Sequence, residues 1–456
     1  MTAERDPDAL LELILREAAA VVEADRCSLF LVDRERGELW SKIAHGTSEI
    51  RFPLGDGIAG AVAASARAER IDDAYADPRF RRAVDQATGY RTRTILTVPM
   101  LSTKREVVGV IQALNRRDGT FTAEDEELLV ALGGQAASAI ENAVLHAEIE
   151  RLFEGFVRAS VVAIEARDPT TAGHSGRVAE LTVGLARAVE AAPPPDLRGL
   201  TFRPDELRQL RYAALLHDFG KVGVREHVLV KADKLYPHEK ELVEARFQLI
   251  RARLELARAE GRMAGRPVDG EEARLRDLDG LWQLVLDCNR PTVLDEDRSA
   301  RLSRLAGLTW NDGKAERPYL TPVELKVLSI PRGSLSEEER REIESHVSHT
   351  FNFLTQIPWT RNLRRVPDIA FAHHEKLNGR GYPRGVPAVQ IPVEARMMSI
   401  SDIYDALTAS DRPYKRAIPA EKAIDILHQE ARGGMLDAGL LGVFVESGTW
   451  KVAGAR

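Results

Sequence analysis

The residues most able to do chemistry in this chain are histidines and aspartates that recur in short motifs. Five of the eleven histidines fall in these motifs. The motif residues are His174, the doublet His217-Asp218, His346, the doublet His373-His374, and Asp402. Imidazole and carboxylate side chains together suit a first-row transition metal such as Fe, Mn, Ni or Zn. A set this large can hold two ions with one bridging carboxylate, an arrangement suited to in-line attack on a phosphate ester.

Apolar runs precede both doublets and predict buried helices that hold them. Residues 213–216 lead into His217-Asp218, and residues 369–372 lead into His373-His374. Successive residues on a helix point about 100° apart. His217 can therefore bind one ion while Asp218 reaches across to a second.

Other residues are expected close to this set. Asp402 falls on a helix predicted from about 395 to 407. Gly220 allows the backbone to pass close by, and Lys221 is placed to contact a phosphate oxygen as a point charge. Glu375 is either a surface glutamate or a carboxylate that orients a metal ligand.

Composition and charge limit the classes of function. A net charge of −6 argues against a general nucleic-acid binder, which needs a basic surface. The only cysteines, Cys27 and Cys288, form no disulfide framework. There is no run of eighteen apolar residues and no signal-like start, so we expect a cytoplasmic protein without a membrane span.

The N-terminal third predicts an antiparallel sheet with flanking helices. An amphipathic helix is expected at 8–23, and a helix at 61–66 after a glycine-rich turn. Alternating patterns and turn signals give the strands. These are expected at 27–32, 38–43, 94–99 and 107–114. Residues 1–147 thus form an α+β domain.

Residues 123–167 predict one long connecting helix. Leu145, Ile149, Leu152 and Phe156 are spaced to form an apolar seam on one face. The seam could pack on its own domain, or pair with its twin in a parallel homodimer. The dimer is favoured because the helix joins two unlike halves.

Residues 156–447 predict an all-α domain. Residues 235–332 contain none of the metal motifs and are interpreted as a helical insertion within it. Helices expected at 238–262 and 270–288 would form a hairpin. The insertion could cap the active site, mediate dimer contacts or dock a partner protein.

The stretch 156–447 resembles an HD-GYP domain, a branch of the HD phosphohydrolase superfamily that hydrolyses cyclic di-GMP to pGpG or GMP. The motifs that carry the resemblance are Thr171-Ala-Gly-His174-Ser-Gly-Arg-Val178, Leu216-His217-Asp218-Phe-Gly-Lys221, His373-His-Glu-Lys-Leu-Asn-Gly-Arg-Gly-Tyr-Pro383, Ile391-Pro392, Asp402-Ile-Tyr-Asp-Ala-Leu-Thr408 and Arg412-Pro-Tyr-Lys415.

The resemblance assigns roles to individual positions. The implied metal ligands are His174, His217, Asp218, His346, His373, His374 and Asp402. Asp218 would bridge the ions and, with Lys221 on the phosphate, carry catalysis. The substrate mouth would be lined by Gly379, Arg380, Gly381 and Tyr382, with Arg412 near a phosphate or guanine.

The chain departs from the family pattern in three places. The middle histidine is assigned to His346 across the insertion because Arg246 interrupts the expected run, with His349 as the rival and His238 weaker. Asn378 stands where the family usually has Asp. Thr170 stands where some members have a carboxylate for a third metal, which favours two divalent ions, Fe or Mn before Ni or Zn.

Residues 8–147 resemble a GAF domain of the cyclic-nucleotide-binding kind. The carrying motifs are 25–33, 52–60, 71–80, 88–96, Asn115-Arg116 and 121–126. The implied ligand is cAMP or cGMP, another small molecule, or none if the module only dimerises. The pocket is expected around Cys27, Ser28, Ile58, Ala59, Asp73, Ala74, Phe80 and Thr94. Cys27 is interpreted as a buried strand residue rather than a chromophore anchor.

Taken together, the sequence predicts a cyclic di-GMP phosphodiesterase gated by a small ligand at the GAF domain. Two alternatives stay open. One is a catalytically weak or inactive cyclic di-GMP receptor that signals through protein contacts. The other is an HD phosphohydrolase for a different nucleotide, including a mixed cyclic dinucleotide.

Overall fold

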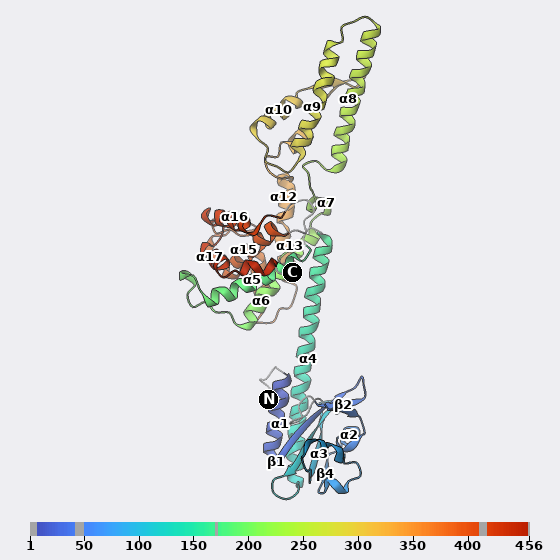
Figure 1. Ribbon diagram of the computed structural model, residues 1–456, viewed down its shortest axis with the longest axis vertical. Helices are drawn as coiled ribbons and strands as arrows, with labels where there is room; N and C mark the ends of the chain where they lie inside the picture. The colour runs from blue at the N-terminus through green and yellow to red at the C-terminus, as the bar shows by residue number, and fades with distance from the viewer. Residues whose placement is uncertain (1–6, 42–49, 169–171, 410–416, 455–456) are drawn as a thin grey trace. The chain divides into compact units, whose positions relative to one another are not determined.

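The computed structural model describes residues 7–41, 50–168, 172–409 and 417–454. The chain divides into two compact units, Met1–Gly155 and Phe156–Arg456 (Figure 1). The first unit is built on an antiparallel sheet with flanking helices, and the second is almost wholly helical. The predicted fold class, an α+β domain followed by an all-α domain, is confirmed.

The sheet of the first unit has six strands in the order β3-β2-β1-β6-β5-β4. The strands are β1 (Ala24–Asp33), β2 (Glu38–Ser41), β3 (Ile50–Pro53), β4 (Glu69–Ile71), β5 (Ile95–Leu101) and β6 (Val107–Arg116). All the pairings within this sheet are antiparallel. The strand expected at 38–43 ends at Ser41 in the described part of the chain.

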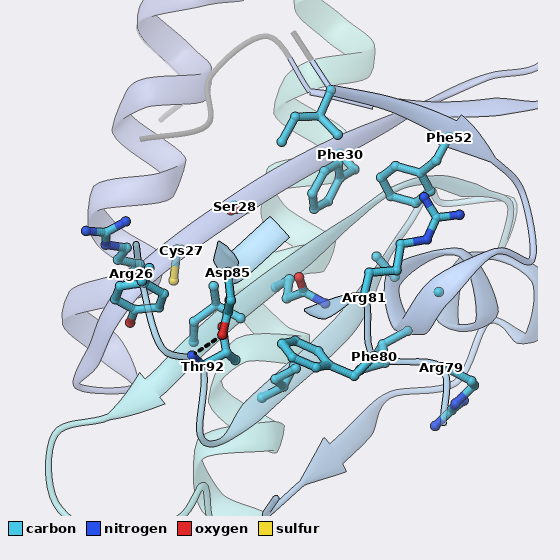
Figure 2. Close-up of a pocket in the computed structure, with 18 of the residues that line it drawn as sticks. Arg26, Cys27, Ser28, Phe30, Phe52, Arg79, Phe80, Arg81, Asp85 and Thr92 are labelled. Carbon is cyan, nitrogen blue, oxygen red and sulfur yellow. Dashed lines mark hydrogen bonds between the residues drawn. The ribbon is translucent and has the colours of Figure 1, made fainter. Parts of the chain in front are cut away.

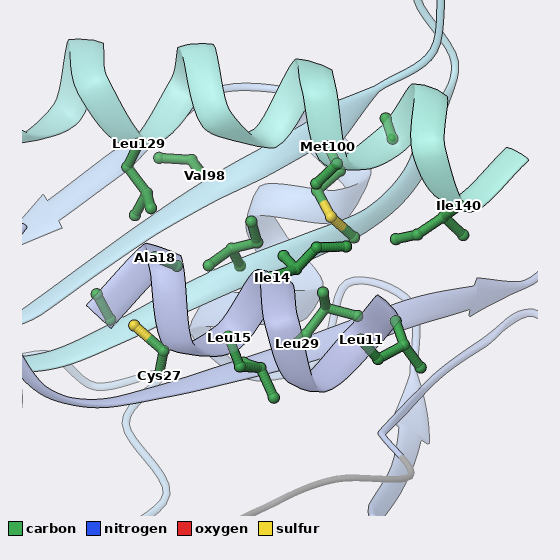
Figure 3. Packing of buried hydrophobic residues seen from close by; sticks show 14 of the residues in the cluster. Leu11, Ile14, Leu15, Ala18, Cys27, Leu29, Val98, Met100, Leu129 and Ile140 are labelled. Atoms are coloured by element: carbon green, nitrogen blue, oxygen red, sulfur yellow. The ribbon is translucent and has the colours of Figure 1, made fainter. Parts of the chain in front are cut away.

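Alternate residues of β1 pack on opposite faces of this sheet. Cys27 and Leu29 pack with α1 (Pro7–Val21) and the first turns of α4 (Ala123–Arg167), as Figure 3 shows. Phe30 faces the other way, toward α2 (Gly57–Ser65). This helix begins four residues earlier than the sequence predicted. The remaining helix of the unit is α3 (Arg82–Thr88).

The Asn115-Arg116 signature has a structural role. The Asn115 side chain accepts hydrogen bonds from the backbone N–H groups of Arg93 (2.6 Å) and Thr94 (3.3 Å). Arg116 Nε donates to Asp125 Oδ2 (2.9 Å) in the first turn of α4. The signature therefore ties β6 and the loop before β5 to the long helix.

Helix α4 is continuous over 45 residues. Its seam residues Leu145, Ile149, Leu152 and Phe156 are 54%, 61%, 76% and 44% exposed. Pairing of this seam with a second copy stays a prediction. By length and composition α4 also meets the test for a helix that could cross a membrane, although no uninterrupted apolar run is present. One such helix is weak evidence, because core helices of soluble proteins meet the same test.

Helices of the second unit pack into a bundle (Figure 1). Outside the insertion they are α5 (His174–Ala191), α6 (Pro204–Leu216), α7 (Glu226–Leu229), α12 (Glu337–Glu344), α13 (His346–Leu354), α14 (Val366–Phe371), α15 (Val393–Thr408), α16 (Ala420–Arg432) and α17 (Ala438–Glu446).

The insertion has its own apolar core between α8 (Pro237–Met263) and α9 (Asp269–Asn289). It continues with α10 (Glu296–Ala306), strands β7 (Thr309–Asn311) and β8 (Glu316–Pro318), and α11 (Pro322–Leu328). The sequence did not predict this hairpin. Its turn is set by Asp312, whose carboxylate accepts from the backbone N–H groups of Lys314 and Ala315 (both 2.7 Å).

Candidate metal centre

Five helices place the predicted ligands in one buried cluster. His174 begins α5, His217 and Asp218 directly follow α6, and His346 begins α13. The doublet His373-His374 follows α14, and Asp402 lies in the middle of α15. All are buried except His374, which is partly exposed. The sequence separates these residues widely, and the helix bundle brings them together.

The ligand atoms form three overlapping groups, each with its atoms within 4.8 Å of one another. The groups are His346, His373 and His374; His174, His217 and Asp218; and His217, His373 and Asp402. Shared members make these groups one continuous cluster. Asp218 lies between its halves, with Oδ1 3.3 Å from His346 Nε2 and Oδ2 3.5 Å from His217 Nε2.

Backbone carbonyls fix the orientation of three of the imidazoles. The Nδ1 atoms of His217, His346 and His373 lie 2.7, 2.6 and 2.6 Å from the carbonyl oxygen three residues earlier in the chain. A carbonyl oxygen only accepts, so each Nδ1 carries the proton and each Nε2 presents a lone pair. Among the described residues, none forms a hydrogen bond with these three buried Nε2 atoms.

A cation resolves this arrangement. A buried acceptor without a partner costs free energy, and two of these lone pairs also face a carboxylate oxygen of Asp218. A divalent cation bound by these acceptors would offset their mutual repulsion. The residues present therefore fit one or more divalent metals.

The protonation states of four residues of the cluster, three imidazoles and one carboxylate, agree with this assignment. Burial lowers the pKa values of His217 and His373, and lowers that of His374 to about 3, so all three stay neutral. Burial alone would raise the pKa of Asp218, but Lys221 and the nearby imidazoles outweigh it and hold that pKa well below its usual range. Neutral imidazoles and an ionised carboxylate are the forms that bind metal.

Asp405 is a buried carboxylate to which the sequence analysis gave no role. Its Oδ2 accepts from His174 Nδ1 (2.8 Å), and Arg177 donates to both of its oxygens (2.7 and 3.0 Å). Burial by itself lowers the pKa of His174, but the hydrogen bonds to Asp402 and Asp405 raise it to about 9. Asp405 lies three residues after Asp402 on α15, a spacing that could have revealed it.

Lys221 is held between two carboxylates. Its Nζ lies 2.9 Å from Asp218 Oδ2 and 3.2 Å from Asp168 Oδ2. Burial lowers the pKa of Lys221, but the two carboxylates outweigh this effect and raise it. Lys221 therefore stays cationic beside the cluster. Asp168, also missed from the sequence, directly follows the last residue of α4.

Gly220 allows the close approach that the sequence suggested. A Cβ at this position would collide with the His346 carbonyl oxygen and the Thr350 backbone nitrogen. The Gly220 N–H donates to Thr350 Oγ1 (2.8 Å), and the same hydroxyl donates to the His217 carbonyl (2.9 Å). No side chain fits where the doublet meets α13.

Glu375 does not act as the sequence analysis suggested. Its oxygens accept from the backbone N–H groups of Arg384 (2.8 Å) and Val386 (3.1 Å), so it holds the loop after the doublet. Within that loop the ring of Tyr382 lies 4.7 Å from the ring of His374. Gly379, Arg380 and Gly381 belong to the same loop, where a Cβ on Gly381 would collide with the Glu375 backbone.

The structure shows the surroundings of most positions at which the sequence departs from the family pattern. His346 lies in the cluster, whereas His349 is exposed with its ring against Gly223. Arg246 pairs with Glu324 inside the insertion (2.7 and 3.0 Å). His238 stacks on Tyr236. Asn378 accepts from the Arg380 N–H (3.1 Å). Arg412 and Thr170 lie outside the described residues.

The first unit contains a cavity of about 180 Å³ (Figure 2). It is lined by five of the predicted residues, namely Cys27, Ser28, Ile58, Ala59 and Phe80. Other lining residues were not predicted, among them Arg26, Phe30, Phe52, Arg79, Arg81, Asp85, Tyr90, Thr92 and Gln112. Asp85 accepts from both the N–H (2.7 Å) and the hydroxyl (2.8 Å) of Thr92.

Three predicted pocket residues do not line this cavity. Asp73 instead accepts from the Tyr75 N–H (3.0 Å) and caps a short 3-10 helix, Ala74–Ala76. Ala74 is fully buried in an apolar cluster with Ile58 and Ile95. Thr94 Oγ1 accepts from the Arg116 N–H (3.1 Å). Ala74 thus packs against two residues that line the cavity, Ile58 and Ile95.

Comparison with known proteins agrees with this architecture. The GAF domain family matches residues 6–140, and two HD domain models match residues 171–281 and 266–440. A curated relative, the probable 3',5'-cyclic phosphodiesterase pde-5 of Caenorhabditis elegans, is 37% identical over 158 residues. That match covers 32% of this chain and 22% of the relative, so the chain spans about a fifth of its length.

Solved structures similar to this chain include the GAF domain/HD domain protein from Geobacter sulfurreducens. It is 15% identical, covers 31% of this chain and 95% of its own, and has a TM-score of 0.27. The GAF domain from a phosphoenolpyruvate-protein phosphotransferase of Coxiella burnetii is 21% identical, covers 31% and 97%, and has a TM-score of 0.26. On the family matches, this chain carries a GAF domain followed by an HD domain.

Proposed function

We propose that this chain is a metal-dependent phosphodiesterase that hydrolyses cyclic di-GMP to pGpG or GMP. The observation that carries the proposal is the set of three buried Nε2 lone pairs, on His217, His346 and His373, that converge without a hydrogen-bond partner in the part of the chain that the structure describes. In this proposal the HD domain is of the HD-GYP kind, because the loop with Gly381, Tyr382 and Pro383 lies beside the cluster.

The proposed ligands are those of the buried cluster, shared between two divalent ions, Fe or Mn before Ni or Zn. They are His174, His217, Asp218, His346, His373, His374 and Asp402. Bound metal would supply Lewis acidity and lower the pKa of water at the site. Asp218 lies between the two halves of the cluster and is the proposed bridge.

The chain's own residues would position the phosphate diester. Lys221 stays cationic and can stabilise the charge that develops on phosphate oxygens. Tyr382, partly exposed beside His374, offers a ring and a hydroxyl to the substrate. Gly379, Arg380 and Gly381 are proposed to line the same mouth.

A ligand of the GAF domain is proposed to regulate this activity. The cavity combines aromatic rings with the hydroxyl, amide and guanidinium groups that a cyclic nucleotide requires. Helix α4 runs without a break from the GAF domain to Arg167, and the next residue, Asp168, contacts Lys221. A shift at the end of α4 would therefore alter the surroundings of the cationic Lys221.

Hydrolysis of cyclic di-GMP by protein loaded anaerobically with Fe(II) or Mn(II) tests the activity. We expect turnover that is lost in the double variant His217→Ala/Asp218→Ala and kept in His349→Ala, an exposed histidine of the same domain. Tight binding of cyclic di-GMP without turnover in any metal would overturn the enzyme proposal and favour a receptor. Turnover of another cyclic dinucleotide alone would replace the substrate.

Calorimetric titration with cAMP and cGMP tests the regulatory ligand. We expect binding that weakens in Phe80→Ala, which opens the cavity wall, and persists in Leu54→Ala, a half-exposed residue of the same domain. The nucleotide that binds should also change the rate of hydrolysis. Equal rates with and without both nucleotides would contradict the regulation and leave the catalytic proposal intact.

A further inference from the structure

Helix α8 of the insertion has two apolar faces, and only one is covered. Val243, Phe247 and Ile250 are buried in the insertion core against α9. On the other side, every seventh residue is apolar and exposed. These residues are Leu242, Leu249, Leu256 and Met263, at 62%, 48%, 50% and 90%.

Alanines complete this exposed pattern. Ala245, Ala252 and Ala259 each follow one of the leucines by three positions, and all three are exposed. Leucine and alanine thus occupy the two apolar positions of a heptad repeat along the helix. Single exposed apolar residues are ordinary, but a strict heptad with both positions filled marks the seam of a helix pair. We call these seven residues the α8 seam.

The first turns of the α8 seam form one wall of an open groove. Leu242, Ala245 and Leu249 line it from the helix, and Trp310 and Pro318 line it from the β7–β8 hairpin. The indole Nε1 of Trp310 is buried without a hydrogen-bond partner in the described structure. The groove thus offers apolar surface and an aromatic ring next to the small side chain of Ala245.

We propose that the α8 seam pairs with the α8 seam of a second copy of this chain, with the two helices antiparallel. In an antiparallel pair each layer combines one residue from each of the two heptad positions, so three of the four large side chains each meet an alanine of the partner. Leu249 meets the partner's Ala259, and Leu256 meets the partner's Ala252. A parallel pair would alternate leucine–leucine layers with alanine–alanine layers, which pack unevenly.

Charge and groove agree with the same register. Glu241 at one end of the seam faces the partner's Arg262 at the other, and two-fold symmetry repeats this pair. In that register the exposed Met263 meets the partner's Ala245 and enters the groove beside the partner's Trp310. A thioether against an aromatic ring is a favourable contact. A second copy of this chain therefore supplies favourable contacts at both ends of the α8 seam.

Cysteine cross-linking of the full chain tests the proposal directly. The variant Ala245→Cys/Met263→Cys places thiols in one layer of the antiparallel pair, whereas Met263→Cys alone leaves its two copies about 27 Å apart along the axis. The native Cys27 and Cys288 are buried, so a short bis-maleimide should react with the introduced thiols and not with these two. We expect a covalent dimer from the double variant and none from the single variant.

A second pair of variants distinguishes specific pairing of the α8 seam from nonspecific apolar association. Adding Leu256→Glu to the double cysteine variant should abolish the cross-link. Adding Val293→Glu, at an apolar residue 62% exposed elsewhere in the insertion, should leave it unchanged. Cross-linking by Met263→Cys alone would indicate a parallel pair and overturn the proposal. The proposal would also be overturned if the double variant, with a circular dichroism spectrum like that of the parent chain, formed no cross-link.

Discussion

The Nδ1 atom of His174 lies 2.8 Å from Oδ2 of Asp405, and both side chains are buried. This bond turns the Nε2 atom of His174 toward Asp402, 3.2 Å away. The other three imidazoles with an assigned orientation use a backbone carbonyl for the same purpose. His174 begins its helix after a glycine and uses a carboxylate that Arg177 holds in turn.

Replacing Asp405 should weaken metal binding. In Asp405→Ala, His174 loses the acceptor that fixes its ring, and Arg177 loses its buried partner. Loss of such an outer carboxylate typically costs ten- to a hundredfold in metal affinity. Titration with Mn(II), followed by metal analysis after dialysis, should show this loss. Asp425→Asn, at an exposed position on α16, should bind metal like the parent chain.

The assignment of the middle histidine can be checked by a matched pair of variants. His346→Ala removes a buried Nε2 atom that faces Asp218, so retained metal should fall markedly. His349→Ala changes an exposed ring one turn away and should retain metal like the parent. The reverse result would show that His349 is the ligand.

Replacing Asp168 should move the alkaline limit of activity. The Asp168 carboxylate helps to raise the pKa of Lys221, so Asp168→Asn should lower that pKa. Lys221 is cationic below its pKa, and the rate that depends on this charge is lost as pH rises through it. The alkaline fall in rate should therefore begin at lower pH in Asp168→Asn. An unchanged pH–rate profile would show that the charge on Lys221 does not limit turnover.

Cys27 should be inert in the folded protein. Burial raises the pKa of its thiol to about 12. At pH 8 only on the order of one thiol in ten thousand would be the reactive thiolate. Iodoacetamide should label Cys27 slowly in the native chain and rapidly in denaturant, as peptide mapping can measure. Rapid labelling in the native chain would contradict the buried interpretation and reopen a covalent role.

Sequence reasoning was most successful where the signal was local. The doublets His217-Asp218 and His373-His374 follow short apolar runs, so both their helices and their burial could be predicted. Asp168 and Asp405 were missed because their partners are distant in sequence. The residues next to Asp168 in the sequence do not indicate its contact with Lys221. That contact forms only when α5 and α6, which lie between the two residues in the chain, have folded.

The GAF cavity shows a different limit. Strand positions alternate between faces, and Ser28 was predicted to line the pocket. Phe30 lies on the same face two residues later and was missed, although the same alternation could have revealed it. Asp85 and Tyr90 come from α3 and the loop after it, whose position over the sheet no periodicity reveals. Thr94 was misplaced because it lies just before β5, where Asn115 and Arg116 engage it.

The distance between the two ends of the insertion determines how much conformational entropy the insertion adds to folding of the HD domain. Lys231 and Glu339, before and after the insertion, form an ion pair of 2.8 Å, and Ser334 Oγ donates to the Lys231 carbonyl (3.0 Å). The two ends of the insertion therefore meet beside the helix that leads to His346. Loop-closure entropy grows only slowly with the length of the intervening chain. The long detour between Asp218 and His346 is thus entropically close to a short loop, and a short linker could replace it without separating the two residues.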